Sequence, residues 1–495
     1  MISLIQNAYS YLDRIAIKSG DAEYSYQQLL EESERIALTL LAGQNDLNES
    51  RIAFLVPADF TYVSIQWAIW RAGGIAVPLC EKHPISSIRY VIEDTNASTI
   101  LYSKEFETLI TALSDIPGIR LLKAEQISNQ PGILPQIEMG RRAMILYTSG
   151  TTGSPKGVVT THQNIEAQIT SLITSWEWTQ EDHILNILPL HHVHGIINVL
   201  CCALWIGACC EFLPKFHPDD VFEVFCKREV NLFMAVPTIY YKLIARWVES
   251  SLDAQKRISN SLEGFRLMVS GSAALPISIL DKWKEISDHT LLERYGMTEM
   301  GMAISNPYRG ERKRGFIGHP LPKVQVRLAD ENNQPVLNNH QGEIQIKGPN
   351  VFLEYWGKPE STKDSFTSDG WFKTGDIAVF EDNSYRILGR NSVDIIKSGG
   401  YKISALEIEE VLRTHPQVKD CAVVGIPDDE WGEIIAASLI IKDQGEIETA
   451  LLTSWLKTLL PSYKIPRKYI IQEDLPRNVM GKVSKNDLKK LISGI

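Results

Sequence analysis

The amino-acid sequence predicts an α/β fold: a large N-terminal domain of mostly parallel sheets flanked by helices, a β-rich module, and a small α+β domain at the C-terminal end. Three observations lead to this prediction. Through most of roughly the first 390 residues, short apolar segments alternate with helical patterns. From about residue 316 the segments become short and alternating, with Asn, Gly and Pro between them. After residue 394 a third pattern begins.

Several segments in the first part are apolar throughout, which is typical of strands covered by helices on both faces. RIAFLVP (51–57) predicts a strand, and residues 60–74 predict a helix that ends at two glycines. Further strands are expected at 74–79, 98–103, 143–149, 185–190, 232–237 and 265–273. Such a series favours large parallel sheets with helices on both sides.

The segment after residue 394 predicts a compact α+β unit of roughly 100 residues, a typical size for a separate domain. Ser404 and Glu407 have the spacing of a capping box that starts a helix. Strands at 420–427 and 434–442, an amphipathic helix at 449–460 and a strand at 468–474 follow.

Composition excludes some classes of protein. The 495 residues carry a formal net charge of −10, which argues against a nucleic-acid-binding surface. No apolar run reaches the ~18 residues of a transmembrane helix. The N-terminus, with Asp13 and Arg14 in its apolar pattern, has the layout of neither a signal nor a transit peptide, so a cytoplasmic location is expected. The seven cysteines are predicted to be small buried hydrophobes rather than metal ligands.

The segment YTSGTTGSPKG (147–157) predicts a phosphate-binding loop. Its glycines let the backbone turn tightly and bring N–H groups onto an anion, while its hydroxyls and Lys156 add donors and positive charge. It is not a Walker A loop, because Pro155 precedes the lysine where that motif has glycine. The candidate residues are Thr148, Ser149, Gly150, Thr151, Thr152, Gly153 and Lys156.

Three further segments are weak when taken singly. WFKTGD (371–376) places Asp376 at a glycine turn, GRNSVDIIKSGGYK (389–402) resembles a basic surface loop, and PRNVMGKVSK (476–485) carries Lys482 in a glycine-flanked loop. In LLERYGMTEMG (291–301), Leu291 and Leu292 predict the end of a buried strand, with Arg294 at its mouth. An arginine there is costly unless a negative group meets it.

Taken in order, the motifs YTSGTTGSPKG, RYGMTE, WFKTGD, GR…SGGYK and PRNVMGK resemble the adenylate-forming superfamily of acyl-CoA synthetases, luciferases and peptide-synthetase adenylation domains. The resemblance covers essentially the whole chain. It implies an N-terminal domain over residues 1–390, which binds ATP and the acid, and a mobile C-terminal domain over 391–495. It also implies two half-reactions: a carboxylate attacks the α-phosphate of ATP, giving an acyl-adenylate and pyrophosphate, and a thiol, usually that of coenzyme A, then displaces AMP.

The resemblance assigns roles for ATP. The loop from Thr148 to Lys156 would hold the β- and γ-phosphates, and Glu299, with Thr151, would hold Mg²⁺. Thr298 would contact the α-phosphate. Adenine would lie against Tyr295, with Gly271, Ser272 and Ala273 opposite, and Gly296 would belong to the same ATP site. Asp376 would accept from the two ribose hydroxyls, and Arg390 would assist at the ribose or the phosphate. Lys482 would bridge the carboxylate and the α-phosphate, stabilising charge that develops only as they react.

For the second half-reaction, the resemblance implies that the small domain rotates, withdrawing Lys482 and presenting the SGGYK loop. Gly399, Gly400 and Lys402 would then meet coenzyme A, the glycines leaving room for the pantetheine arm. Relatives usually carry the pivot two positions after the matching arginine. This chain has one extra residue there, so Ser392, Val393 and Asp394 all stay open.

Arg294 indicates which acid is bound. ERYGMTE followed by SNPY (305–308) resembles the malonyl-CoA synthetase branch, whereas fatty-acid-activating relatives usually carry an uncharged residue before Tyr-Gly. A small dicarboxylate would leave one carboxylate opposite the arginine fork. His192, His194 and Met300 are further candidates for the acid pocket, with core packing an equal alternative for Met300.

Five alternatives stay open. Arg294 could pair with an internal acid such as Glu293. The protein could activate short or medium monocarboxylic acids, or be a non-catalytic nucleotide-binding member of the fold. The sequence also leaves open malonate against methylmalonate, and coenzyme A against a carrier-protein thiol.

Overall fold

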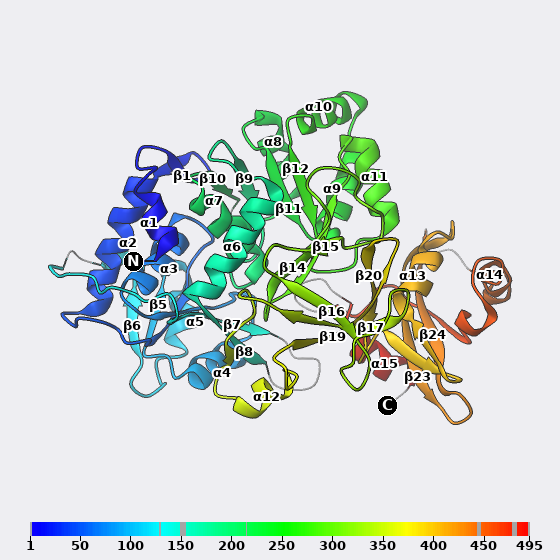
Figure 1. Ribbon diagram of the computed structural model, residues 1–495. Coiled ribbons are helices and arrows are strands. Elements are labelled where there is room, and N and C mark those ends of the chain that lie inside the picture. Colours follow the sequence, from blue (N-terminus) through cyan, green and yellow to red (C-terminus); the bar gives the residue numbers. More distant parts are fainter. Residues whose placement is uncertain are drawn as a thin grey trace.

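The computed structural model describes residues 2–127, 130–148, 155–213, 215–442, 447–477 and 483–493. The predicted α/β fold is confirmed, with two large, mostly parallel sheets side by side (Figure 1). Helix α6 (His162–Trp176) lies between them and contacts β8 of one sheet and β14 of the other.

The first large sheet is built from the N-terminal strands. In the described residues it has seven strands, in the order β18-β8-β7-β4-β3-β5-β6. The pairs are parallel except for β7–β8 and β8–β18. The strands are β3 (Arg51–Leu55), β4 (Ile75–Pro78), β5 (Thr99–Tyr102), β6 (Arg120–Lys123), β7 (Arg142–Thr148), β8 (Lys156–Thr161) and β18 (Glu354–Tyr355).

The second large sheet has nine strands over the described ranges, in the order β15-β14-β13-β12-β11-β9-β10-β1-β2. The run from β13 to β1 is parallel throughout. The strands are β1 (Ile15–Ser19), β2 (Ala22–Ser25), β9 (His183–Asn186), β10 (Cys209–Phe212), β11 (Leu232–Ala235), β12 (Leu267–Ser270), β13 (Leu292–Met297), β14 (Gly301–Ser305) and β15 (His319–Pro320).

Helices cover both sheets. The predicted helix at 60–74 is α3 (Phe60–Arg71), which is buried almost all round, with Trp67 and Trp70 in the main core. The others in this part are α1 (Ser3–Ala8), α2 (Tyr26–Leu41), α4 (Ile85–Thr95), α5 (Glu107–Thr111), α7 (Cys202–Trp205), α8 (Pro218–Lys227), α9 (Pro237–Glu249), α10 (Leu252–Leu262), α11 (Ile277–Ser287) and the π-helix η3 (His194–Cys201). Among the described helices, none is both long and apolar enough to cross a bilayer.

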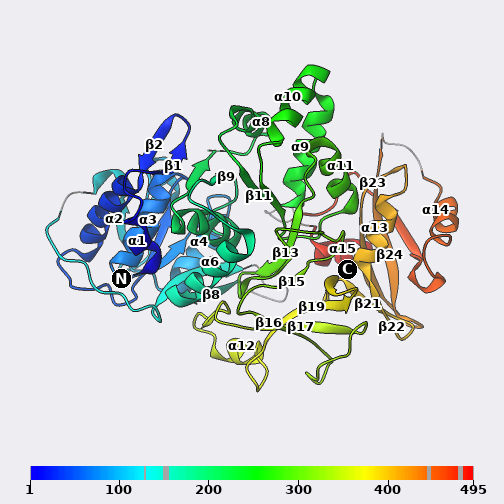
Figure 2. The ribbon, with the colours of Figure 1, turned by 45° about the horizontal axis from the view of Figure 1, so that its top comes forward.

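The β-rich module predicted after residue 316 is an antiparallel sheet in the order β16-β17-β19-β20. It lies between the two large sheets and the C-terminal unit, which occupies one side of the molecule (orange to red in Figures 1 and 2). Its strands are β16 (Gln325–Ala329), β17 (Gln341–Lys347), β19 (Phe372–Glu381) and β20 (Ser384–Arg390), with α12 (Pro359–Asp364) before β19.

The C-terminal unit has its own buried cluster around Ile408, Leu412 and Leu439. Ser404 caps α13 as predicted, accepting from the Glu407 N–H at 3.2 Å. The Glu407 carboxylate turns instead to Lys464, so only half of the capping box forms. The elements are β21 (Ile395–Ser398), β22 (Tyr401–Ser404), α13 (Ala405–Arg413), β23 (Val418–Asp428), β24 (Gly432–Ile441), α14 (Thr449–Leu456), β25 (Lys468–Ile471) and α15 (Lys485–Ser493).

Two predicted strand ends were wrong. The strand before Arg294 does not stop at Leu292 but continues to Met297, because β14 folds back and pairs with it from Arg294–Ser305 to Met297–Gly301. The strand expected at 185–190 is β9, which ends at Asn186.

Candidate active site

Arg294 lies on β13, just beyond the point where the neighbouring strand β12 ends. β12 stops at Ser270, while its parallel partner β13 continues past that point. The guanidinium therefore lies beneath the loop that follows β12, only 4% exposed. A Cβ at Gly271 would be 2.4 Å from its Nη1, so glycine is the residue that this approach allows.

The contacts of Arg294 are polar but uncharged. Its Nη2 donates to Ser272 Oγ at 3.3 Å, and the same oxygen lies 3.3 Å from Nδ1 of His194. Ser272 has a φ of +66°, a left-handed conformation that few serines adopt. Nε of Arg294 has no hydrogen-bond partner among the described residues, and burial lowers the pKa of Arg294 to about 9. Among the residues that the structure describes, this buried cation therefore has no anionic partner.

Glu293 does not supply that anion. Successive strand residues face opposite sides of a sheet, so Glu293 points away from Arg294. Its backbone carbonyl accepts from the Asn306 side chain, and burial raises the pKa of its carboxyl to about 8. Within the described residues no carboxylate forms an ion pair with Arg294, which contradicts the internal-pair alternative for that part of the chain.

Glu299 is the reverse case of Arg294, a carboxylate with no cationic partner among the described residues. It lies with Thr298 in the turn between β13 and β14, and burial raises the pKa of its carboxyl. Tyr355 donates its hydroxyl to Oε1 at 2.8 Å. No lysine, arginine or histidine of the described ranges forms an ion pair with this carboxylate. A carboxylate without a cation has the chemistry of a ligand for a hard divalent ion.

Only the two ends of the predicted phosphate loop lie within the described residues. Thr148 closes β7 and Lys156 opens β8, and the two residues pair across the hairpin. The Lys156 ammonium lies 4.9 Å from the centre of the Tyr355 ring. The predicted residues between them, Ser149, Gly150, Thr151, Thr152 and Gly153, lie outside the described residues, as does Lys482.

Asp376 and Arg390 come together as neighbours on β19 and β20. Arg390 Nε donates to Asp376 Oδ1 at 2.9 Å, and the Tyr295 hydroxyl donates to Oδ2 at 2.6 Å. Arg390 Nη2 also donates to Oδ2, at 3.4 Å. A carboxylate accepts about four hydrogen bonds, so these three leave capacity for one further donor, such as a hydroxyl.

The remaining predicted residues of the acid and nucleotide sites differ in their surroundings. His194 joins it through Ser272, whereas the His192 ring packs 4.2 Å from that of His191. Met300 is fully buried in the main core, which favours packing over a pocket floor. A Cβ at Gly296 would lie 2.0 Å from the Gly301 carbonyl oxygen, so this glycine is required by the hairpin itself. Ala273 is exposed in the loop after β12.

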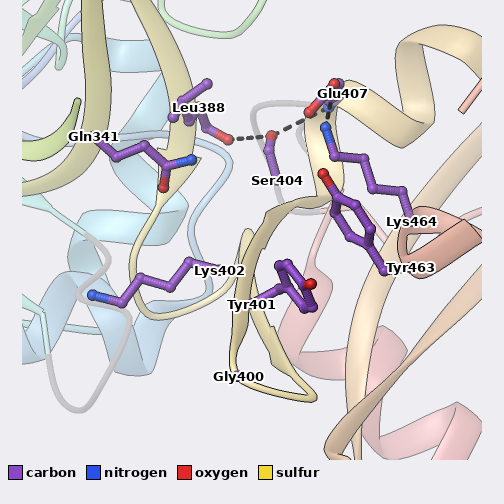
Figure 3. Close-up of a pocket in the computed structure, with 9 residues that line it drawn as sticks. All are labelled: Gln341, Leu388, Gly400, Tyr401, Lys402, Ser404, Glu407, Tyr463 and Lys464. Atoms are coloured by element: carbon purple, nitrogen blue, oxygen red, sulfur yellow. Dashed lines mark hydrogen bonds and ion pairs between the residues drawn. The ribbon is translucent and has the colours of Figure 1, made fainter. Parts of the chain in front are cut away.

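The loop predicted to meet coenzyme A lies elsewhere, against the β-rich module. Gly399 and Gly400 have φ values of +55° and +81°, and Lys402 forms an ion pair with Glu331 at 2.8 Å. Figure 3 shows the loop beside Tyr463 and Gln341, around a cavity of about 310 Å³.

Two contributions were missed by the sequence reasoning. Tyr355 touches both Glu299 and Lys156, and the Ser272 side chain, rather than its backbone alone, contacts Arg294. No local signal marks either role, since Tyr355 is 56 residues from Glu299 and the Ser272 contact depends on an unusual φ.

Arg294 and Glu299 lie five residues apart on one hairpin, and neither forms an ion pair within the described part of the chain. A cation and a carboxylate placed in this way suit an enzyme that takes up an organic acid together with a metal-bound nucleotide, as adenylate-forming ligases do. The chain belongs to the AMP-binding enzyme family. The family model matches residues 4–356, and that of the AMP-binding enzyme C-terminal domain matches residues 407–482.

Relatives and solved structures agree with this membership. The chain is 44% identical to the mitochondrial malonate–CoA ligase ACSF3 of Homo sapiens, over 97% of this chain and 90% of that protein. ATP-bound MatB from Rhodopseudomonas palustris superimposes with a TM-score of 0.91 at 32% identity, covering 99% of both chains. Apo MatB from the same organism gives 0.81 at 31% identity, covering 100% of this chain and 99% of that one.

Proposed function

We propose that this protein joins malonate, or a 2-substituted malonate such as methylmalonate, to coenzyme A. The reaction consumes ATP, passes through an acyl-adenylate and releases AMP and pyrophosphate. One observation carries the choice of acid: Arg294 is buried, cationic and without an acidic partner in the described chain. The malonate–CoA ligase named among its relatives supports the same substrate class.

The acid pocket follows from the contacts of Arg294. One carboxylate of a dicarboxylate faces the nucleotide, and the other meets the guanidinium fork, with Ser272 Oγ and the His194 ring as neighbouring polar groups. A monocarboxylic acid would leave the buried charge unpaired, which typically costs several kcal/mol. This disfavours the alternative of a short- or medium-chain fatty acid ligase.

The residues present fit Mg²⁺ and ATP. Glu299 offers a partly buried carboxylate with no cationic partner in the described ranges, and Lys156 offers a cation for the phosphates together with Thr148 and residues 149–154. Asp376 with Arg390 and Tyr295 suits the ribose and adenine, with the Gly271–Ser272–Ala273 loop opposite. ATP would supply the adenylyl group that activates the acid, with pyrophosphate as the leaving group. Lys482 is proposed to neutralise the charge that develops between the two.

We further propose the domain division 1–390 and 391–495, with the small domain mobile. The higher TM-score with ATP-bound than with apo MatB supports an arrangement suited to the first half-reaction. Lys402–Glu331 and the Ile277 N–H to Glu410 bond (3.0 Å) hold the C-terminal unit in this arrangement. Asp394 is held from both sides, since it accepts from the Arg390 N–H at 2.9 Å and forms an ion pair with Lys485 of α15 at 2.6 Å, so Ser392, Val393 and Asp394 all stay candidate pivots.

A cytoplasmic location is proposed as well. The seven free cysteines fit any reducing compartment, so they do not separate the cytoplasm from the mitochondrion named for the human relative. Cell fractionation against markers of both compartments tests this point, and recovery with the mitochondrial marker would contradict it.

A panel of acids tests the function. Pyrophosphate release is measured with ATP, Mg²⁺ and each of malonate, methylmalonate, succinate, acetate and butyrate, with and without coenzyme A. We expect acid-dependent release that is largest for a malonate, and a thioester only when coenzyme A is present. A higher kcat/KM for butyrate would favour the monocarboxylate ligase, and no acid-dependent release would favour a nucleotide-binding protein without catalysis.

A further inference from the structure

Tyr355 contacts two groups that come from different sheets. Its hydroxyl donates to Oε1 of Glu299 at 2.8 Å, in the turn between β13 and β14 of the second large sheet. Its ring lies 4.9 Å from the ammonium of Lys156, at the start of β8 in the first. Tyr355 is thus a bridge between the carboxylate proposed for Mg²⁺ and the lysine proposed for the phosphates.

The segment around Tyr355 is held on both sides. Leu353 N–H donates to Val159 O at 2.9 Å and Trp356 N–H donates to Gly157 O at 2.8 Å, which fixes the segment to β8. On the other side, Phe352 N–H donates to the backbone carbonyl of Glu299 at 2.7 Å. The backbone therefore sets where the tyrosine ring and hydroxyl stand relative to both sheets.

The chemistry of the two contacts differs. The tyrosine hydroxyl is a neutral donor, and its bond to Oε1 fixes the orientation of the Glu299 carboxylate. The ring face attracts the ammonium of Lys156 through its quadrupole. A buried tyrosine kept for packing alone needs one partner for its hydroxyl, which a backbone carbonyl can supply. Here the partner is the partly buried carboxylate of Glu299, which is proposed to bind metal.

We infer that Tyr355 is a positioning residue: it orients Glu299 toward Mg²⁺ and holds Lys156 beneath the phosphates, and so fixes the spacing of metal and triphosphate. The inference rests on the proposed use of Mg²⁺ and ATP, but not on which acid is activated. Removing only the hydroxyl should therefore affect the metal, whereas removing the ring as well should also affect the nucleotide.

Calorimetric binding of ATP across a series of free Mg²⁺ concentrations, without acid, separates these effects. Tyr355→Phe keeps the ring, Tyr355→Leu removes both contacts, and Tyr26→Phe is the matched control. Tyr26, the first residue of α2, is fully buried and donates its hydroxyl at 2.6 Å to the carbonyl of Ala208, just before β10. Thermal unfolding of each variant is recorded alongside.

We expect Tyr355→Phe to raise the half-saturating Mg²⁺ concentration about tenfold, the usual effect of losing a hydrogen bond to a charged group, and to keep the ATP affinity reached at saturating Mg²⁺. Tyr355→Leu should also lower that plateau affinity, and Tyr26→Phe should change neither. A half-saturation that is the same in Tyr355→Phe and Tyr26→Phe would overturn the inference, as would identical plateaus for the Phe and Leu variants. Failure of the parent protein to bind ATP with Mg²⁺ would instead contradict the proposed function.

Discussion

The guanidinium of Arg294 fills the space in which Gly271 would carry a side chain: a Cβ there would lie 2.4 Å from Nη1 and 2.5 Å from Cζ. The loop after β12 and the arginine on β13 are therefore matched to one another. Any side chain at residue 271 must displace either the loop or the guanidinium, because real Cβ contacts are not that short.

Gly271→Ala is expected to lower kcat/KM for malonate by about tenfold or more, since overpacking of this kind costs ~1–3 kcal/mol and falls on the acid-binding arginine. Activity towards butyrate should fall less. Gly264→Ala is the control, because a Cβ there has no heavy atom nearer than 3.8 Å. Steady-state kinetics with both acids check this. An equal loss of kcat/KM for malonate and butyrate would mean that the substitution disturbs the fold rather than the acid-binding arginine.

Glu293→Gln should remove a pH dependence of stability. Burial and the nearby Glu410 raise the pKa of the Glu293 carboxyl to about 8 in the folded protein, against an ordinary value of 4.5. Between those values the folded state holds the proton more tightly, so the stability contributed by this group is present at low pH and is lost as pH rises towards 8.

The measurement is the free energy of unfolding of parent and Glu293→Gln by denaturant titration at pH 5, 6.5 and 8. The free energy of unfolding of Glu293→Gln should rise relative to that of the parent as pH rises, by about 2–4 kcal/mol over this range. The difference should level off above pH 8. A difference that is independent of pH would mean that the carboxyl is not protonated in the folded protein.

Lys482→Ala should abolish formation of the acyl-adenylate yet leave thioester formation from supplied malonyl-adenylate largely intact. The reason is that the proposed role of Lys482 belongs only to the first half-reaction. ATP–pyrophosphate exchange and thioester assays measure the two steps separately. Equal losses in both would show that the lysine supports the fold or both conformations.

Gly400→Trp should have the reverse effect, since a bulky side chain is expected to block the path of the pantetheine arm. Gly400 has a φ of +81°, so any side chain there is strained, and Gly400→Ala is needed to separate strain from bulk. Exchange should persist in both variants while thioester formation collapses only in the tryptophan variant. A parallel fall of exchange in Gly400→Trp would make the residue structural.

Much of the fold could be predicted because its strands are locally apolar. β3, β4, β5, β11 and β12 lie within the segments expected from hydrophobicity alone. β13 was placed too short because its second half, Arg294 to Met297, is not apolar and owes its strand form to pairing with β14. β9 begins and ends earlier than its apolar run, since its partners are His183 to Asn186 opposite Cys209 to Phe212.

The site was predictable where it rests on contiguous motifs and not where it rests on distant partners. Asp376 and Arg390 were expected together, and the structure makes them neighbours on paired strands. Whether an internal acid pairs with Arg294 could not be settled from the sequence, because the contacts of Arg294 and the absence of an ion pair for it among the described residues are set by the fold. Tyr355 reaches Glu299 through the pairing of β18 with β8, which no local pattern encodes.

The ratio of kcat/KM for malonate to that for butyrate, in parent, Arg294→Leu and Arg294→Lys proteins of confirmed folding, tests the central claim most directly. Arg294→Leu should lose malonate activity by about hundreds- to thousands-fold, as removing one member of a buried charged pair costs about 3–5 kcal/mol, while butyrate activity stays or rises. Arg294→Lys should retain only part of the malonate activity, because lysine keeps the charge but not the two-pronged geometry of the guanidinium. The account predicts a ratio that collapses in the leucine variant and recovers partly with lysine, whereas an unchanged ratio across all three proteins would contradict it.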